Sequence, residues 1–172
     1  DNYTYDINIK STIGFDDEDI KSITDKYSNI DKIEAFYQMD LDGKYKNQDI
    51  TVRKIINSFD NEINKLNLIK GRLPQNSNEC VVLRFGTFFD EYDSNSKIKV
   101  DNEFYQIVGV VESSVYYYRI SEIANAGDGD LEAIIYLDSR YNEFDIYTDV
   151  VVTIKDAIIS AVTSFLSLLL VA

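Results

Sequence analysis

Residues 30–56, IDKIEAFYQMDLDGKYKNQDITVRKII, carry the pattern that decides the fold class. Residues 30–41 read as one strand, and residues 44–56 read as a second strand with a high isoleucine and valine content. Between them stands Asp42-Gly43, a pair that favours the tight two-residue turn of a β-hairpin because both positions tolerate a positive φ. The stretch therefore predicts a hairpin with its turn at these two residues.

A strand precedes the hairpin at the start of the chain. Tyr3, Tyr5, Ile7 and Ile9 alternate with polar residues, which is the period of a half-buried strand. Gly14 is expected to end this strand.

A short helix is predicted next, over about residues 16–27. Asp16 is a suitable N-cap, and three acidic residues follow it in the first turn, where the helix dipole favours negative charge. Ile20 and Ile23 mark the stripe that we expect to be buried. A strand, a helix and a hairpin in this order are typical of the opening of an α+β domain.

The rest of the chain reads as strands separated by loops. Residues 58–78 are expected to be a loop with a helical turn near Asn61–Lys65, because Gly71, Pro74 and the Asn-Ser-Asn run before Glu79 are typical turn residues. Strands are predicted at residues 79–84, 97–100, 103–112, 133–137 and 146–154. The predicted fold class is therefore α+β: a mixed, mainly antiparallel sheet with a few helices, in one domain or in two lobes that share a core.

Composition excludes several classes of function. The 172 residues carry 17 Lys and Arg against 30 Asp and Glu, for a net charge of −13, so nucleic acid is not expected as a partner. The chain has no histidine, which is the commonest general base near neutral pH and the commonest zinc ligand. Cys80 is the only cysteine and is expected to be a buried core thiol. We expect no cofactor, no metal site and no catalytic residue.

Carboxylate pairs offer the remaining route to an enzyme, since a glycosidase needs two carboxylates across a cleft. Such pairs lie in the predicted helix turn at residues 16–19, at Asp40 and Asp42 near the predicted hairpin tip, at Asp90-Glu91 and at Asp128/Asp130. Each place has a structural explanation in a helix start, a hairpin or a solvated loop. The run at residues 128–132 also lacks the glycine and glutamate that a helix–loop–helix calcium site requires at its sixth and twelfth positions.

One short run is a candidate for binding a partner. Tyr116, Tyr117, Tyr118 and Arg119 are consecutive, and tyrosine and arginine are enriched at binding hot spots. The alternative is that alternate tyrosines of this run point into the core of a strand.

Three segments together resemble the MacB-like periplasmic core domains, which are the extracytoplasmic domains of FtsX-like ABC transporter permeases. The first is GFDDEDIKSITDKYSNIDKIEAF, residues 14–36, which resembles the helix and following strand of that family. The second is LIKGRLPQNSNECVVL, residues 68–83, in which Gly71, Arg72, Pro74 and Glu79 match a Gly-Arg-x-Pro…Glu segment. The third is FYQIVGVVESSVYYY, residues 104–118, similar to a segment of Gram-positive members.

The resemblance implies a role and a location. A domain of this family lies outside the cell membrane between two membrane helices of a permease, and a cytoplasmic ATP-binding subunit hydrolyses ATP. The resemblance thus implies mechanical coupling to export or signalling at the cell envelope, a dimer in the full-length transporter, and an envelope protein or peptide as a further partner.

The domain organisation and the function each have alternatives that the sequence leaves open. The chain is expected to comprise an extracytoplasmic core domain over residues 1–155 and an apolar helix over residues 156–172, which is either a linker helix or part of a membrane span. In place of a permease domain, the chain suits a free-standing secreted cell-surface binding module or adhesin. An envelope hydrolase that uses paired carboxylates ranks last.

Overall fold

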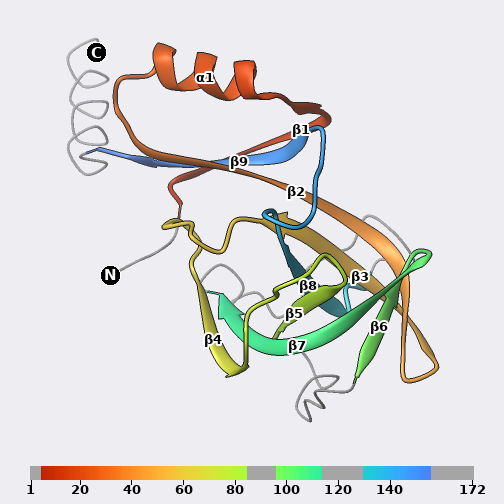
Figure 1. Ribbon diagram of the computed structural model, residues 1–172. Coiled ribbons are helices and arrows are strands. Elements are labelled where there is room, and N and C mark those ends of the chain that lie inside the picture. Colours follow the sequence, from red (N-terminus) through yellow and green to blue (C-terminus); the bar gives the residue numbers. More distant parts are fainter. Residues whose placement is uncertain (1–4, 85–95, 114–129, 156–172) are drawn as a thin grey trace, which may run out of the picture.

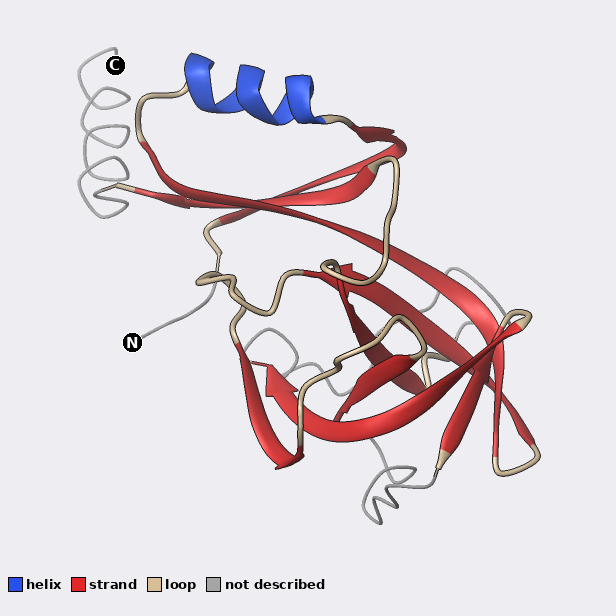
Figure 2. Ribbon diagram, in the orientation of Figure 1, coloured by secondary structure: helices blue, strands red, loops and turns tan. Residues whose placement is uncertain are grey.

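The computed structural model describes residues 5–84, 96–113 and 130–155. Within these ranges one helix and nine strands form (Figures 1 and 2). In chain order they are β1 (Ile7–Phe15), α1 (Asp17–Lys26), β2 (Ile30–Tyr45), β3 (Gln48–Asn57), β4 (Leu66–Gly71), β5 (Glu79–Leu83), β6 (Lys97–Val100), β7 (Glu103–Ser113), β8 (Ala133–Asp138) and β9 (Tyr147–Ile154). Among these described strands, only the pairs β3–β8 and β5–β7 are parallel, so the predicted α+β class with a mixed, mainly antiparallel sheet is confirmed.

Helix α1 begins where its capping residues predict. Asp16 Oδ1 accepts a hydrogen bond from Asp19 N at 2.9 Å, and Asp19 Oδ2 accepts one from Asp16 N at 3.1 Å. This reciprocal pair satisfies two amides that the first helical turn leaves without a partner. Helix α1 lies over one face of a sheet, and none of its residues is fully buried there. Ile20 and Ile23, which were expected to form the buried stripe, are only half-buried.

The predicted position of the hairpin turn is wrong. Asp42 and Gly43 lie within β2 and pair with Thr51 and Ile50, while the turn is formed by Lys46 (φ 46°) and Asn47 (φ 66°). The longer strand places Tyr45 in the core, at 2% exposure.

A different constraint requires the glycine of the Asp-Gly pair. A Cβ atom at Gly43 would lie 2.8 Å from the backbone oxygen of Lys99 and 2.6 Å from Val52 Cγ2. Gly43 itself pairs with Val100, so the missing side chain lets β6 approach β2 closely.

Six strands close into a ring, which we call the closed sheet. Its hydrogen-bonded order is β2–β3–β8–β5–β7–β6, and β6 pairs back to β2. Apolar side chains from alternate positions of all six strands fill its interior. They are Tyr45, Ile50, Val52, Ile56, Cys80, Val82, Ile98, Val100, Tyr105, Ile107, Val110, Ala133, Ile135 and Leu137.

The other part of the molecule, which we call the N-terminal sheet, consists of β1, β9 and the first half of β2, with α1 over one face (Figure 1). β2 pairs with β9 from Ile30 to Phe36 and with β3 from Tyr37 to Tyr45. One strand therefore belongs to both parts. A second apolar cluster, which includes Phe36, Val151 and Ile63, packs against the outer face of the closed sheet.

Strand β4 was not expected, since residues 58–78 read as loop. It pairs only with β7 at an edge of the sheet, and five of its six residues are exposed. The strand therefore depends on its hydrogen bonds to β7 rather than on a buried face of its own.

Two predictions fall outside the described residues. They are the helix at residues 156–172 and the partner-binding run Tyr116–Arg119, and both stay predictions. Among the helices that the structure describes, none has the length and apolar character needed to cross a membrane.

The turn at residues 46–47 yields a stability test. Replacing Lys46→Asn together with Asn47→Gly introduces the residue pair that best tolerates two positive φ angles, so we expect the free energy of unfolding to rise by about 0.5–1 kcal/mol. Urea unfolding would measure the change. Lys44→Asn, within β2, is the control and should give no gain; a double variant without added stability would contradict this turn position.

Candidate functional site

The ends of two parallel strands meet at one rim of the closed sheet. β3 and β8 run side by side, and their last residues, Asn57 and Asp138, are paired. Ser139 N donates a hydrogen bond to the backbone oxygen of Asn57 at 3.0 Å. The chain segments that follow the two strands therefore start next to each other.

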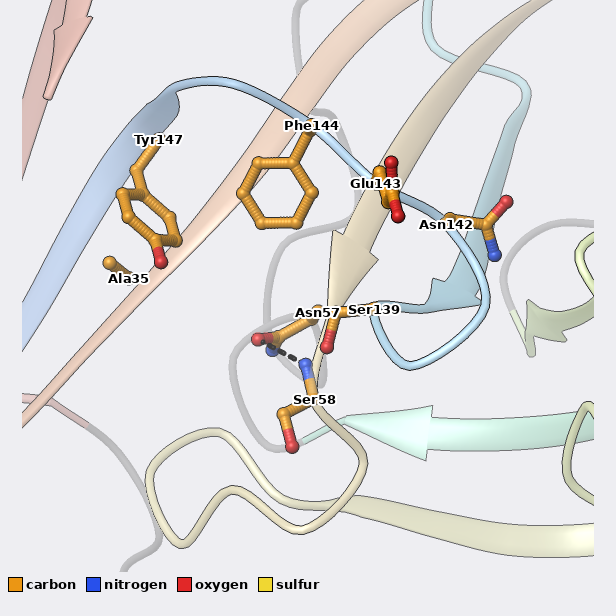
Figure 3. A pocket seen from close by; sticks show the side chains of 8 residues that line it. All are labelled: Ala35, Asn57, Ser58, Ser139, Asn142, Glu143, Phe144 and Tyr147. Atoms are coloured by element: carbon orange, nitrogen blue, oxygen red, sulfur yellow. Dashed lines mark hydrogen bonds between the residues drawn. The ribbon is translucent and has the colours of Figure 1, made fainter. Parts of the chain in front are cut away.

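A cavity of about 350 Å³ lies beside this rim, and we call it the junction pocket (Figure 3). Ala35 of β2 and Tyr147 of β9 come from the N-terminal sheet. The other lining residues are the last residue of β3, Asn57, and residues that follow β3 and β8; the latter are Ser58, Ser139, Asn142, Glu143 and Phe144. The pocket thus lies where the N-terminal sheet meets the closed sheet, and its volume is at the lower end of the range for small-ligand sites.

The loop that carries half of the lining is anchored by a buried carboxylate. Asp138 has a side chain with 0% exposure, and Arg140 Nη2 donates to its Oδ2 at 2.6 Å. The backbone N of Arg140 donates to Asp138 Oδ1 at 2.9 Å, and Asn142 Nδ2 donates to the backbone oxygen of Asp138, also at 2.9 Å. These hydrogen bonds fix the conformation of the loop that begins at Ser139 beside the pocket.

Two aromatic rings form one side of the pocket. Phe144 and Tyr147 meet edge to face with ring centroids 5.2 Å apart, and Tyr37 lies 6.1 Å from Phe144 on the closed sheet. The Tyr147 hydroxyl donates to Asp17 Oδ1 at 3.0 Å. Burial is the main cause that raises the pKa of Tyr147, and the hydrogen bond to Asp17 raises it further. The phenol therefore remains protonated near neutral pH.

The polar side of the pocket carries the amide of Asn57 and two serine hydroxyls. Asn57 Oδ1 accepts from Ser58 N at 2.9 Å and from Asn61 Nδ2 at 2.7 Å, and within the described residues its NH₂ group donates to no acceptor. The hydroxyls of Ser58 and Ser139 lie on the same side. Rings on one side and amide and hydroxyl groups on the other suit binding of a polar small group.

Of the candidate chemical residues that the structure describes, none lines the junction pocket, although Asp17 accepts a hydrogen bond from the lining residue Tyr147. Cys80 is fully buried inside the closed sheet, where burial raises its thiol pKa, as expected of a core residue. Across the described residues, no group of histidine, cysteine or carboxylate side chains has a spacing that suits a metal ion. Asp90-Glu91 and Asp128 lie outside the described residues.

Asp40 requires a correction, because it does not lie at a hairpin tip. It sits opposite Arg53 across β2 and β3, and the pair is bidentate, with Arg53 Nε 2.7 Å from Oδ1 and Nη2 3.0 Å from Oδ2. Both side chains are buried, so the interaction is a structural ion pair of the outer face of the closed sheet.

The Gly-Arg-x-Pro…Glu segment closes a loop, as its turn residues predict. Gly71 has φ +78°, and a Cβ atom there would lie 2.2 Å from the backbone oxygen of Val108. Arg72 then donates to both carboxylate oxygens of Glu79, at 2.6 and 2.7 Å, and Gln75 N donates to Glu79 Oε2 at 2.8 Å. The segment is therefore a fixed structural loop between β4 and β5.

Glu79 supplies a pH-dependent stability test. The Arg72 hydrogen bonds hold its pKa at about 2, below the ordinary 4.5. A lowered folded-state pKa stabilises the protein above pH 4.5, and this contribution is lost as the pH falls towards 2. Glu79→Gln should therefore cost about 1–2 kcal/mol at pH 7 and progressively less below pH 4.5, as measured by urea unfolding.

The control for this test is Asp49→Asn. Asp49 lies 3.1 Å from Lys44, but both side chains are at least half exposed, so its loss should change stability by less than about 0.5 kcal/mol at either pH. An equal loss in the two variants, or a Glu79→Gln effect that does not change with pH, would contradict the assignment.

The chain is similar to known proteins in its fold. No family model matches the chain, and no curated protein matches it either. Among solved structures, the chain is similar to the extracellular domain of the noncanonic ABC-type transporter YknZ from Gram-positive bacteria, with a TM-score of 0.52 and 15% identity over 86% of this chain and 76% of that one. It is also similar to the periplasmic region of MacB from Actinobacillus actinomycetemcomitans, with a TM-score of 0.50 and 16% identity over 94% of this chain and 74% of that one. The chain therefore has the fold of the MacB-like extracytoplasmic domains of ABC-type transporters, as the three sequence segments predict.

Proposed function

We propose that this chain is the extracytoplasmic domain of an ABC-type, FtsX-like permease and that it couples cytoplasmic ATP hydrolysis to export or to mechanical signalling at the cell envelope. The fold shared with the YknZ and MacB domains supports this proposal. In this proposal the ATP-binding subunit is a partner through the membrane part of a longer protein, and two copies form the complete transporter.

The observation that carries the proposal is the position of the two described ends of the chain. Ile7 at the start of β1 pairs with Val152 near the end of β9. Asp6 N donates to the backbone oxygen of Val152 at 2.9 Å, and Ile154 N donates to Asp6 Oδ2 at 2.7 Å. Ends that lie side by side suit a domain inserted between two successive membrane helices, since both helices can approach the same edge of the N-terminal sheet.

A movement at these ends has a short route into the closed sheet. β9, which carries Val152, pairs with the first half of β2. The second half of β2 belongs to the closed sheet, where it pairs with β3. Two further contacts join the parts: Glu34 Oε1 accepts from the backbone N of Glu62 at 2.6 Å and from that of Ile63 at 2.8 Å. A displacement of the membrane helices is therefore expected to move the two parts together or to change the angle between them.

The test is the location of the domain in intact cells that express the full-length protein. Phe104 is 62% exposed on β7, so Phe104→Cys presents a thiol to solvent, whereas the native Cys80 is fully buried. A membrane-impermeant maleimide should label the Phe104→Cys protein in intact cells, and the labelled protein should sediment with membranes together with an ATP-binding subunit.

Wild-type protein is the matched control, because it retains Cys80 and should remain unlabelled without denaturant. Labelling that requires permeabilised cells would place the domain on the wrong side of the membrane. Labelled protein released into the medium, without an ATP-binding subunit, would favour the secreted binding module instead.

A further inference from the structure

The junction pocket carries negative charge that has no cationic partner among the described residues. Glu143 lines the pocket, and Asp17 accepts the hydroxyl hydrogen of Tyr147 at its edge. Neither carboxylate forms an ion pair within the part of the chain that the structure describes. Arg140 lies nearby, but its guanidinium is held by Asp138. The pocket therefore presents net negative charge in a chain of net charge −13.

The aromatic side of the pocket suits the same kind of ligand. The faces of Phe144 and Tyr147 border the opening, opposite the side chains of Ser58 and Ser139 (Figure 3). A cation near an aromatic face is attracted by the ring quadrupole. An ammonium group has three donors and no acceptor, and the Glu143 carboxylate supplies an acceptor for it.

The amide NH₂ group of Asn57, which lines the pocket, indicates which ligand group accompanies the cation. The NH₂ group of Asn57 has no acceptor among the described residues, and its Oδ1 is already used twice. A peptide carbonyl is the natural partner for this amide donor. A lysine side chain together with its own peptide group presents both an ammonium and a carbonyl, and it is small enough for a cavity of about 350 Å³.

We propose that the junction pocket binds a lysine side chain of a peptide, with the ammonium at Glu143 between the rings and the carboxylate, and with a peptide carbonyl at Asn57. This binding holds whether the chain is part of a permease or a separate cell-surface module, so its failure and that of the proposed function are distinguishable.

The test is an NMR titration of the full 172-residue chain at low ionic strength. The probe is N-acetyl-lysine amide, and its neutral counterpart is N-acetyl-norleucine amide, which has a similar shape and no charge. The lysine probe should shift the backbone amide signals of Ser58, Ser139 and Glu143, and the norleucine probe should bind much more weakly.

Two matched variants locate the charge that matters. Glu143→Gln and Asp145→Asn each remove one exposed carboxylate from the same loop, but only Glu143 lines the pocket. Glu143→Gln should raise the dissociation constant of the lysine probe by about threefold, and Asp145→Asn should leave it almost unchanged. Phe144→Leu should also weaken binding, with thermal unfolding as the check that the closed sheet still folds.

Several results would overturn the proposal. An equal effect of Glu143→Gln and Asp145→Asn would mean that the probe is attracted by overall charge alone. Equal binding of the norleucine probe would mean that the pocket recognises apolar bulk, and an absence of shifts at the pocket with the lysine probe would mean that it does not bind this group. Because Glu143 is exposed, its substitution is not expected to impair folding.

Discussion

The change of hydrogen-bonding partner along β2 is the constraint on which the rest of the structure depends. Up to Phe36 the strand pairs with β9, and from Tyr37 it pairs with β3, without a break in the strand. Gln38 N donates to Thr148 Oγ1 of β9 at 2.8 Å, so side chains of the N-terminal sheet still contact β2 after its backbone has changed partner. Burial of Phe36 and Val151 beside Ile63 then packs the N-terminal sheet against the outer face of the closed sheet.

The junction pocket is a consequence of this arrangement. β3 and β8 are parallel, so both end at the rim that faces the N-terminal sheet, and the segments after them are anchored there by Asp138. A ligand at this place touches β2 and β9 on one side and the ends of β3 and β8 on the other. Under the proposed permease function, occupancy of the pocket and movement of a membrane part joined to β1 and β9 would influence each other.

Local signals predicted the elements that depend on local interactions. The capping box at Asp16 and Asp19 defines α1, and the apolar run after Glu79 predicts the buried strand β5. The hairpin turn was misplaced because Asp42-Gly43 is a strong turn signal, whereas Gly43 is required by the close approach of Lys99, which lies far along the chain. β4 was missed because its pairing with β7 is non-local and its side chains are exposed. The junction pocket could not be predicted either, since Ala35, Asn57 and Phe144 form no motif and meet only through the topology of the sheet.

Native-state hydrogen exchange of the full chain tests most directly whether β2 unites the two parts. If it does, the free energy of opening measured at the amides of β9, such as Val151, should nearly equal that measured at the amides of β3 and β8. The reason is that opening either part disrupts the strand that both share. If the two parts are separate units that only touch, the amides of β9 and of β2 before Phe36 would exchange at a much lower free energy than those of the closed sheet. A single protected unit that runs across Phe36 and Tyr37 is the expected result, and two separate levels of protection would show that β2 does not unite the two parts.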